Sequence, residues 1–162
     1  KAIDQVMLPP TPLLQFIAGQ NIVGSLLGVY AGSVIILLVL PLRTGLCFNG
    51  WSFLFMFLNG AVFSTIGVVV SFYAKNHADV PRFSNYVIMP MAYLCNTFFS
   101  AQNMPDGIRQ LISWLPLSQT SAALRQIANQ EAFSLTGIWI LVLYLACFSA
   151  AASWFLYKKK NL

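Results

Sequence analysis

Four stretches without a single Asp, Glu, Lys or Arg constrain the fold of this chain more than any other feature. They cover residues 16–42, 44–74, 83–105 and 132–157. Each exceeds the roughly 20 apolar residues that cross about 30 Å of hydrocarbon. Only 8% of the chain is charged, against about a quarter in ordinary soluble domains. The sequence therefore predicts one polytopic, all-α membrane domain over residues 1–162 and excludes both a soluble globular domain and disorder.

The predicted transmembrane helices occupy 16–42, 44–74, 83–103 and 132–157. Pro90 lies inside the third and should kink it, because proline removes a backbone hydrogen bond. With four spans, both ends of the chain lie on the same side of the membrane. Placing them in the cytoplasm puts six basic residues inside and three outside, as the positive-inside rule requires. The three on the outside are Arg43, Arg109 and Arg125.

The net charge of +5 does not indicate a nucleic-acid partner, because the basic residues are scattered over loops and one C-terminal tail. Residues 1–15 are expected to lie along the cytoplasmic surface. Ile3, Val6 and Met7 follow helical spacing there, and the prolines that come next end the helix. The chain starts at Lys1 rather than at a methionine, which indicates the interior of a longer protein.

Glycines recur at every fourth position of the first predicted span, at Gly24, Gly28 and Gly32. Glycines spaced in this way share one helix face and let another backbone approach closely. Helix packing is the favoured interpretation, and the lining of a ligand groove is the alternative. Asn59 lies near the middle of the second span, where an amide is costly unless it is hydrogen-bonded. We expect an interhelical hydrogen bond there, with substrate contact as the alternative.

Residues 104–131 are predicted to form two short helices outside the membrane core, between the third and fourth spans. An apolar stripe at helical spacing lies between two prolines, and a second short helix follows over 118–128. These helices are too short to span, so they should lie on or dip into the outer surface. Arg109 and Arg125 could attract an anionic substrate or simply be solvated. The candidate residues of this segment are Pro105, Ile108, Arg109, Leu111, Ile112, Leu115, Pro116 and Arg125.

Several kinds of chemistry are missing from the sequence. It contains no phosphate-binding loop, no paired carboxylates, no Cys/His ligand cluster and no serine-hydrolase triad. No catalytic or metal-binding residue is therefore predicted, and His77, the only histidine, is read as a loop residue. Ion-driven carriers place ionisable groups at membrane depth, and the predicted spans have none. If the chain transports, the energy should come from another subunit.

Three stretches carry a resemblance to a known family. They are "IDQVMLPPTP" before the first span, "LCNTFFSAQNMP" at 94–105 and "ISWLPLSQTSAALR" at 112–125. In these stretches, and over nearly its whole length, the chain resembles the type-2 ABC exporter permeases. It departs from the family pattern at Cys95 and Asn96, where members often have Ser-Gly. Members usually have six spans, so the resemblance implies that the first two are missing here.

The resemblance implies half of a homodimeric export channel in a bacterial inner membrane or archaeal plasma membrane. A separate ATPase subunit would hold ATP and magnesium, and this chain would bind no cofactor and not be an enzyme. The family's coupling helix would correspond to the segment with Asp4, Val6, Pro10 and Pro12, and the 104–128 helices to its re-entrant gate. Substrates would be drugs, polysaccharides or lipid-linked molecules, with membrane lipid as a further partner. The alternative is a non-transport scaffold or assembly subunit that offers its glycine face to partner helices.

Overall fold

The computed structural model describes residues 13–39, 41, 48–74, 76, 79–93, 106–132 and 134–160. Most of these residues form helices, and they contain no strand. The three long helices are α2 (Leu13–Val39), α3 (Gly50–Tyr73) and α8 (Thr136–Lys160). They contain apolar segments of 23, 22 and 19 residues that are long enough to cross a membrane. The predicted fold class, a polytopic all-α membrane protein, is confirmed.

The ends of the long helices follow local backbone chemistry rather than the limits of the charge-free stretches. Prolines at positions 12 and 41 flank α2, and the residue before a proline disfavours helical backbone. Asn49 precedes α3 in extended conformation, and Ala74 ends it in extended conformation. At the start of α8, the Thr136 N–H donates to Ser134 Oγ over 3.3 Å.

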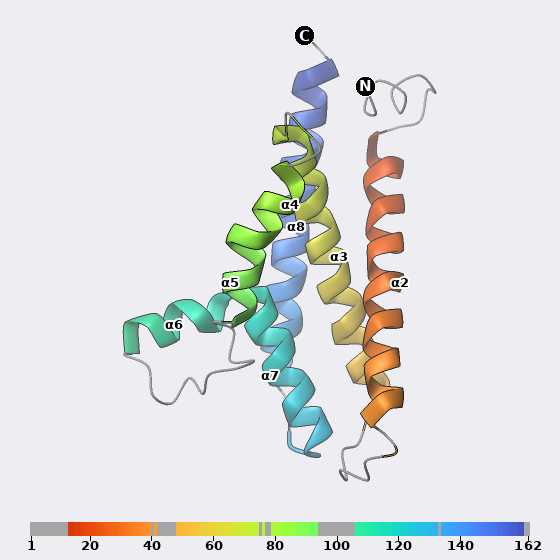
Figure 1. Ribbon diagram of the computed structural model, residues 1–162, viewed down its shortest axis with the longest axis vertical. Helices are drawn as coiled ribbons and strands as arrows, with labels where there is room; N and C mark the ends of the chain where they lie inside the picture. Colours follow the sequence, from red (N-terminus) through yellow and green to blue (C-terminus); the bar gives the residue numbers. More distant parts are fainter. Residues whose placement is uncertain are drawn as a thin grey trace.

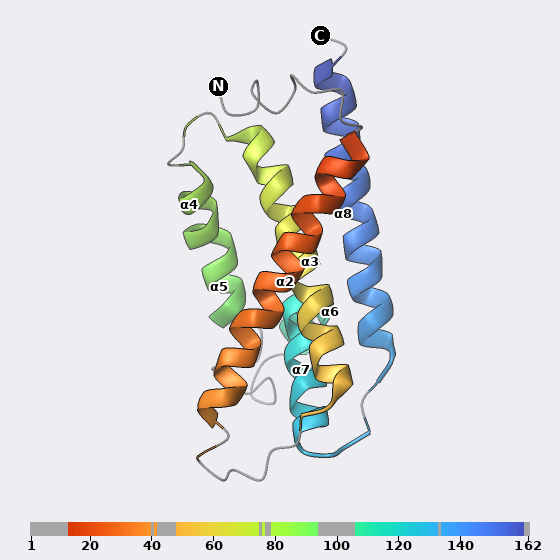
Figure 2. The same cartoon turned by 90° about the vertical axis from the view of Figure 1, so that its right-hand side faces the viewer.

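The long helices pack around α3. Both α2 and α8 contact α3 more than they contact each other, and α2 crosses α3 obliquely (Figures 1 and 2). The beginning of α2, the end of α3 and the end of α8 lie at one end of the bundle. The end of α2 and the beginnings of α3 and α8 lie at the other end.

Around Pro90, where a kinked helix is expected, the described residues form a helical segment of mixed type. It consists of α4 (Asp79–Phe83), a π-helical turn η2 (Ser84–Ile88) and α5 (Met89–Ala92). In η2 the Met89 N–H bonds to Ser84 O, five residues back rather than four. Pro90 has no N–H to donate, and the wider turn before it keeps the backbone helical up to the proline. The predicted remainder of this span, 94–103, lies outside the described residues.

Two short helices follow, α6 (Asp106–Trp114) and α7 (Pro116–Ala128). The corner between them is Leu115, which is extended at φ −66° and ψ 137° because a proline follows it. Pro116 therefore ends the first helix as expected and also begins the second, slightly earlier than the sequence indicates. The Gln119 side chain fixes the corner by donating Nε2–H to Ser113 O over 2.6 Å.

The orientation of these two helices differs sharply. α6 lies across the long axis of the bundle, whereas α7 runs along that axis beside α3 and α8 (Figure 1). α7 ends near the bundle end at which α3 and α8 begin. α7 thus packs along the sides of the long helices, whereas α6 does not run parallel to them.

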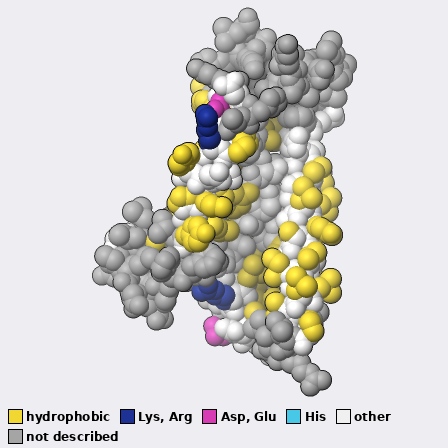
Figure 3. All heavy atoms as spheres, viewed as in Figure 1, with side chains coloured by type: hydrophobic (Ala, Val, Ile, Leu, Met, Phe, Trp, Pro, Cys, Tyr) yellow, Lys and Arg dark blue, Asp and Glu magenta, His cyan; other side chains and the backbone are white. Residues whose placement is uncertain are grey.

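Few apolar side chains among the described residues are buried, as expected where lipid, which is as apolar as the side chains, surrounds a bundle. One cluster joins α3, α7 and α8, and a second joins α2, α3 and α8. Large apolar side chains cover much of the outer surface of α2, and Leu27 and Tyr30 are 62% and 69% exposed. In the space-filling view, hydrophobic side chains occupy the middle of the molecule and the described basic side chains lie towards its two ends (Figure 3). The first cluster comprises Phe55, Val62, Ala123, Ile127 and Leu141, and the second Ile17, Val68 and Ala152.

Candidate functional site

The glycines of α2 lie against α3. A methyl group added at Gly28 would be 3.2 Å from Gly60 Cα and 3.3 Å from Met56 O. One added at Gly24 would collide with the Ser64 side chain, and one at Gly32 would lie 2.5 Å from Met56 Sδ. The first contact is with the α3 backbone and the other two are with side chains. The glycine face is therefore covered within this chain by α3.

Gly60 of α3 completes this contact from the opposite side. A methyl group there would lie 2.7 Å from Gly24 O and 2.9 Å from Ser25 Cα, both of which are main-chain atoms of α2. No side chain can move aside to make room at this point. Gly60 is thus the position at which the two backbones constrain each other most tightly.

Asn59 bridges α3 to α7. Its Oδ1 atom lies 3.2 Å from Thr120 Oγ1, which is also 3.0 Å from Pro116 O. A threonine hydroxyl has one proton, so it cannot donate to both oxygens at once. If the amide is turned over, so that its oxygen and nitrogen exchange places, Asn59 Nδ2 donates to Oγ1 while Thr120 donates to the Pro116 carbonyl. The polar group at this depth is then satisfied by an interhelical hydrogen bond.

A second amide–threonine pair joins α2 to α3. Thr65 Oγ1 lies 2.7 Å from Asn21 Oδ1 and 2.8 Å from Ala61 O, the same pattern of contacts. Next to it, the Ser64 hydroxyl donates to Gln20 O over 2.8 Å. Polar side chains of the long helices are thus used to connect helices, as in other membrane bundles.

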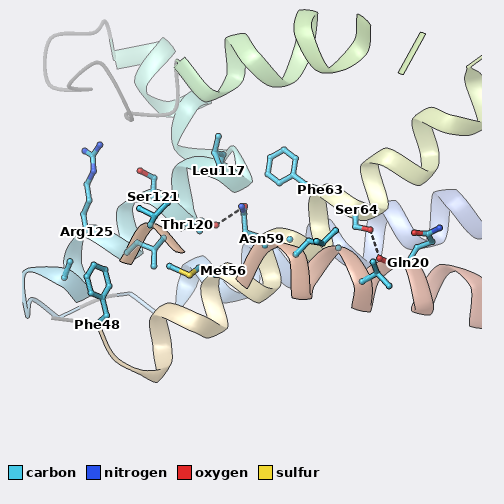
Figure 4. Close-up of a pocket in the computed structure, with 18 of the residues that line it drawn as sticks. Gln20, Phe48, Met56, Asn59, Phe63, Ser64, Leu117, Thr120, Ser121 and Arg125 are labelled. Atoms are coloured by element: carbon cyan, nitrogen blue, oxygen red, sulfur yellow. Dashed lines mark hydrogen bonds between the residues drawn. The ribbon is translucent and has the colours of Figure 1, made fainter. Parts of the chain in front are cut away.

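An open groove of about 1110 Å³ lies between α2, α3 and α7 (Figure 4). Apolar side chains such as Val23, Leu27 and Phe63 form much of its lining. Arg125 and Phe48 lie towards one end of the groove, and Gln20 and Ser64 towards the other. Asn59, Gly24 and Gly28 also line it, so these three positions belong both to the helix contacts and to the groove.

The predicted gate residues are only partly described. Ile112 is 6% exposed, Pro116 is buried and Leu115 is half-buried at the corner, whereas Arg125 is exposed in the last turn of α7. The backbones of Ile108, Arg109 and Leu111 belong to α6, but their side chains lie outside the description, as does Pro105. The structure therefore places the corner residues against the bundle and Arg125 at the groove.

The predicted coupling residues Asp4, Val6, Pro10 and Pro12 lie outside the described residues. Within the described part of the chain, no three His, Cys, Asp or Glu side chains are close enough to hold a metal ion.

Comparison with known proteins assigns the family. The family model for the ABC-2 type transporter matches residues 3–129, well over half of the chain. The chain belongs to the ABC-2 type transporter family. Its helices α2, α3, α6 and α7 all fall within the matched region, as does the groove between them. The match therefore includes every element that forms the candidate site of this ABC-2 protein.

Curated relatives of this ABC-2 protein include an inner membrane transport permease, YadH, from Escherichia coli K12. It is 24% identical over 159 residues, which cover 91% of this chain and 60% of YadH. The YadH protein of Shigella flexneri matches equally well. Nodulation protein J of Bradyrhizobium diazoefficiens is 29% identical over 70 residues, 43% of this chain and 27% of that protein. The chain thus spans less than two thirds of the length of the YadH proteins, and no solved structure matches it.

Sequence reasoning missed Gly60, Asn21 and Thr120 as partners in these contacts. One signal was present for each of the polar residues, because an amide or hydroxyl inside an apolar run needs a hydrogen-bond partner. For Gly60, the only signal in the sequence was its position beside Asn59. None of these signals says which helix supplies the partner, because packing between helices in lipid depends on the shapes of both surfaces.

Proposed function

We propose that the intact protein is the permease subunit of an ATP-driven exporter, with ATP hydrolysed on a separate subunit. The observation that carries this proposal is the ABC-2 family match over residues 3–129, which includes the groove and helix α7. A transport permease from Escherichia coli among the relatives supports it. By this analogy the membrane is a bacterial inner membrane or an archaeal plasma membrane.

The scaffold alternative loses its main support. It relied on the face with Gly24, Gly28 and Gly32 being available to partner helices, but α3 of the same chain already covers that face. The space in front of the Cβ direction of each of these glycines is taken by α3, so a partner helix could not pack onto this face as α3 does.

We infer that the ATPase docks on the segment with Asp4, Val6, Pro10 and Pro12, which precedes α2. A short amphipathic stretch ended by prolines can transmit movement to the long helix that follows it. The positive-inside rule supports a cytoplasmic location for this segment and for the end of α8, which has Lys158, Lys159 and Lys160. ATP and magnesium would be bound by the ATPase.

On the opposite side of the membrane, α6 and α7 would form the outer gate of a homodimeric path. The course of α7 along α3 and α8 supports this role, because it brings the corner at Leu115 and Pro116 beside the long helices. Residues 104–131 would then be external. Drugs, polysaccharides and lipid-linked molecules are the substrate classes we propose, with membrane lipid around the bundle.

Nucleotide-dependent crosslinking tests the proposal. The native Cys47, Cys95 and Cys147 are replaced by alanine, and one cysteine is introduced as Asp4→Cys in the intact, tagged permease. We expect an ATPase subunit to co-purify and to crosslink to this cysteine with a yield that changes when ATP is added. Gln110→Cys is the matched control, because that exposed α6 residue should face the other side of the membrane.

Two outcomes would contradict the proposal at different levels. If no ATPase co-purifies with a folded permease, the transport function itself is wrong and a scaffold is favoured. If the ATPase co-purifies but crosslinks equally from Gln110→Cys, the function stands and the assignment of the coupling segment is wrong.

A further inference from the structure

The groove between α2, α3 and α7 runs along the helices rather than across them. Gln20 and Ile35 both belong to α2 and both line the groove. With a rise of about 1.5 Å per residue, the helix between them is about 22 Å long. That length is most of the ~30 Å thickness of the hydrocarbon layer. A ligand that fills the groove must therefore be long, and it must lie parallel to the lipid chains around the bundle.

Several of the polar groups in the groove are occupied by one another, and the remaining polar side chains are few: Gln20, Ser121, Asn129 and Arg125. Asn59 contacts Thr120, and Ser64 donates to the Gln20 carbonyl. A bound molecule would find these partners already used and would otherwise meet apolar side chains such as Val23, which is 53% exposed. The body of the ligand should therefore be hydrocarbon.

The charge in the groove is confined to one end. Among the described residues that line it, Arg125 is the only ionisable one, and Figure 4 shows its guanidinium beyond the apolar part of the groove. Arg125 is in the last turn of α7, where the negative end of the helix dipole favours a cation. Guanidinium groups bind phosphate with two parallel hydrogen bonds. A long apolar groove with an arginine at one end is complementary to an anionic amphiphile.

We propose that this groove binds one acyl chain of an anionic phospholipid from the surrounding bilayer, with the lipid phosphate at Arg125. The groove is open rather than enclosed, so a lipid need not pass through the packed core of the bundle to reach it. Apolar contacts alone give little preference in a membrane, because the competing lipids are equally apolar. Preference for this lipid must then come from the headgroup charge. The proposal depends on the chain lying in a membrane and is independent of transport.

Photocrosslinking identifies the occupant. The intact permease, with Phe63→benzoylphenylalanine in the groove wall, is reconstituted in nanodiscs of equal parts phosphatidylglycerol and phosphatidylcholine. We expect mass spectrometry of the irradiated protein to show mainly a phosphatidylglycerol adduct. An Arg near a membrane surface adds about 1 kcal/mol of attraction for an anionic lipid, so Arg125→Gln should lower the ratio of the two adducts about fivefold. Arg82→Gln, at an exposed arginine outside the groove, should leave the ratio unchanged.

Groove-filling variants test whether the lipid occupies this particular space. Leu27→Trp fills the groove from α2 and should abolish the adduct. Leu26→Trp is its control, since Leu26 is 58% exposed but does not line the groove. Ser121→Phe fills the groove from α7, with Ala122→Phe as the exposed neighbouring control. The two pairs are independent, so a folding defect in one still leaves the other to decide.

Three results would overturn the proposal. One is an adduct to a peptide of the permease itself or of a second copy, which would mean that a protein helix fills the groove. Another is equal capture of the two lipids with no response to Arg125→Gln. The third is an adduct that survives both filling variants. None of these results bears on ATPase co-purification, so the proposed function would be unaffected.

Discussion

Replacing Gly60 by alanine tests whether the contact between α2 and α3 is one of backbone against backbone. The added methyl group would lie 2.7 Å from Gly24 O, whereas ordinary contact begins at 3.4 Å. The helices must therefore separate by about 0.7 Å along this direction, the difference between the two distances. A gap of this size forfeits roughly a quarter to a half of the dispersion energy of each affected contact. Overpacking of this kind costs about 1–3 kcal/mol.

Gly67→Ala is the matched control, because a methyl group there meets no atom within 4 Å. Both variants remove a helical glycine from α3, so both gain the same intrinsic preference of alanine, about 1 kcal/mol. The difference between their free energies of unfolding isolates the steric cost, for which we expect about 1–3 kcal/mol. Unfolding by SDS in mixed micelles, followed by circular dichroism, measures this difference. If Gly60→Ala is as stable as Gly67→Ala, the helices can separate at no cost and the reasoning is wrong.

Gly32→Ala adds an internal check on the same argument. Its methyl group would meet Met56 Sδ at 2.5 Å, but a thioether at the end of a flexible side chain can rotate away. Gly32→Ala should therefore cost less than Gly60→Ala. A larger cost for Gly32→Ala would show that side-chain crowding, and not backbone approach, limits this interface.

Three further predictions concern the polar link and the gate. A double-mutant cycle of Asn59→Leu and Thr120→Val, measured by the same unfolding assay, should give a coupling energy of about 0.6 kcal/mol, typical of hydrogen bonds between membrane helices; a coupling of zero would mean that the two side chains do not bond. A cysteine at Gln110 should react with a membrane-impermeant thiol reagent in intact cells, and labelling only in broken membranes would refute both the external gate and the proposed topology. Neutralising Arg109 and Arg125 together should reduce export of anionic substrates while leaving expression and export of neutral substrates intact; equal loss of both would indicate a structural role.

The sequence was sufficient for features that depend on local chemistry. Charge-free stretches identified the long helices because hydrocarbon excludes ionised side chains, and the pattern around Pro116 identified the two short helices. The limits of the long helices were less predictable. α8 continues through Lys158 to Lys160, since backbone hydrogen bonds form regardless of side-chain charge. The sequence predicts a kink at Pro90, and the π-helical turn that precedes the proline has no signal in the residue types.

For each helix contact in the candidate site, the sequence predicted one of the two residues but not its partner. The spacing of Gly24, Gly28 and Gly32 marked a face for close packing, but its partners on α3 are revealed only by the folded chain. Likewise, Asn59 indicated the need for a hydrogen bond, while its partner Thr120 lies on a different helix, far along the sequence. The groove combines residues of three helices, so no local pattern could have shown its length or the position of Arg125 at its end.

The contact at Gly60 has a mechanical consequence. Interfaces made of side chains allow helices to slide, because rotamers readjust as the surfaces shear past one another. Between α2 and α3 such a layer is missing at Gly60, where main-chain atoms meet directly, and axial sliding would drive the Ser64 or Met56 side chain into the α2 backbone. The pair is therefore expected to move as one stiff unit. A change of shape would then take place at the side-chain-filled boundaries with α7 and α8. A displacement of the start of α2 would be transmitted to these boundaries by α2 and α3 moving together.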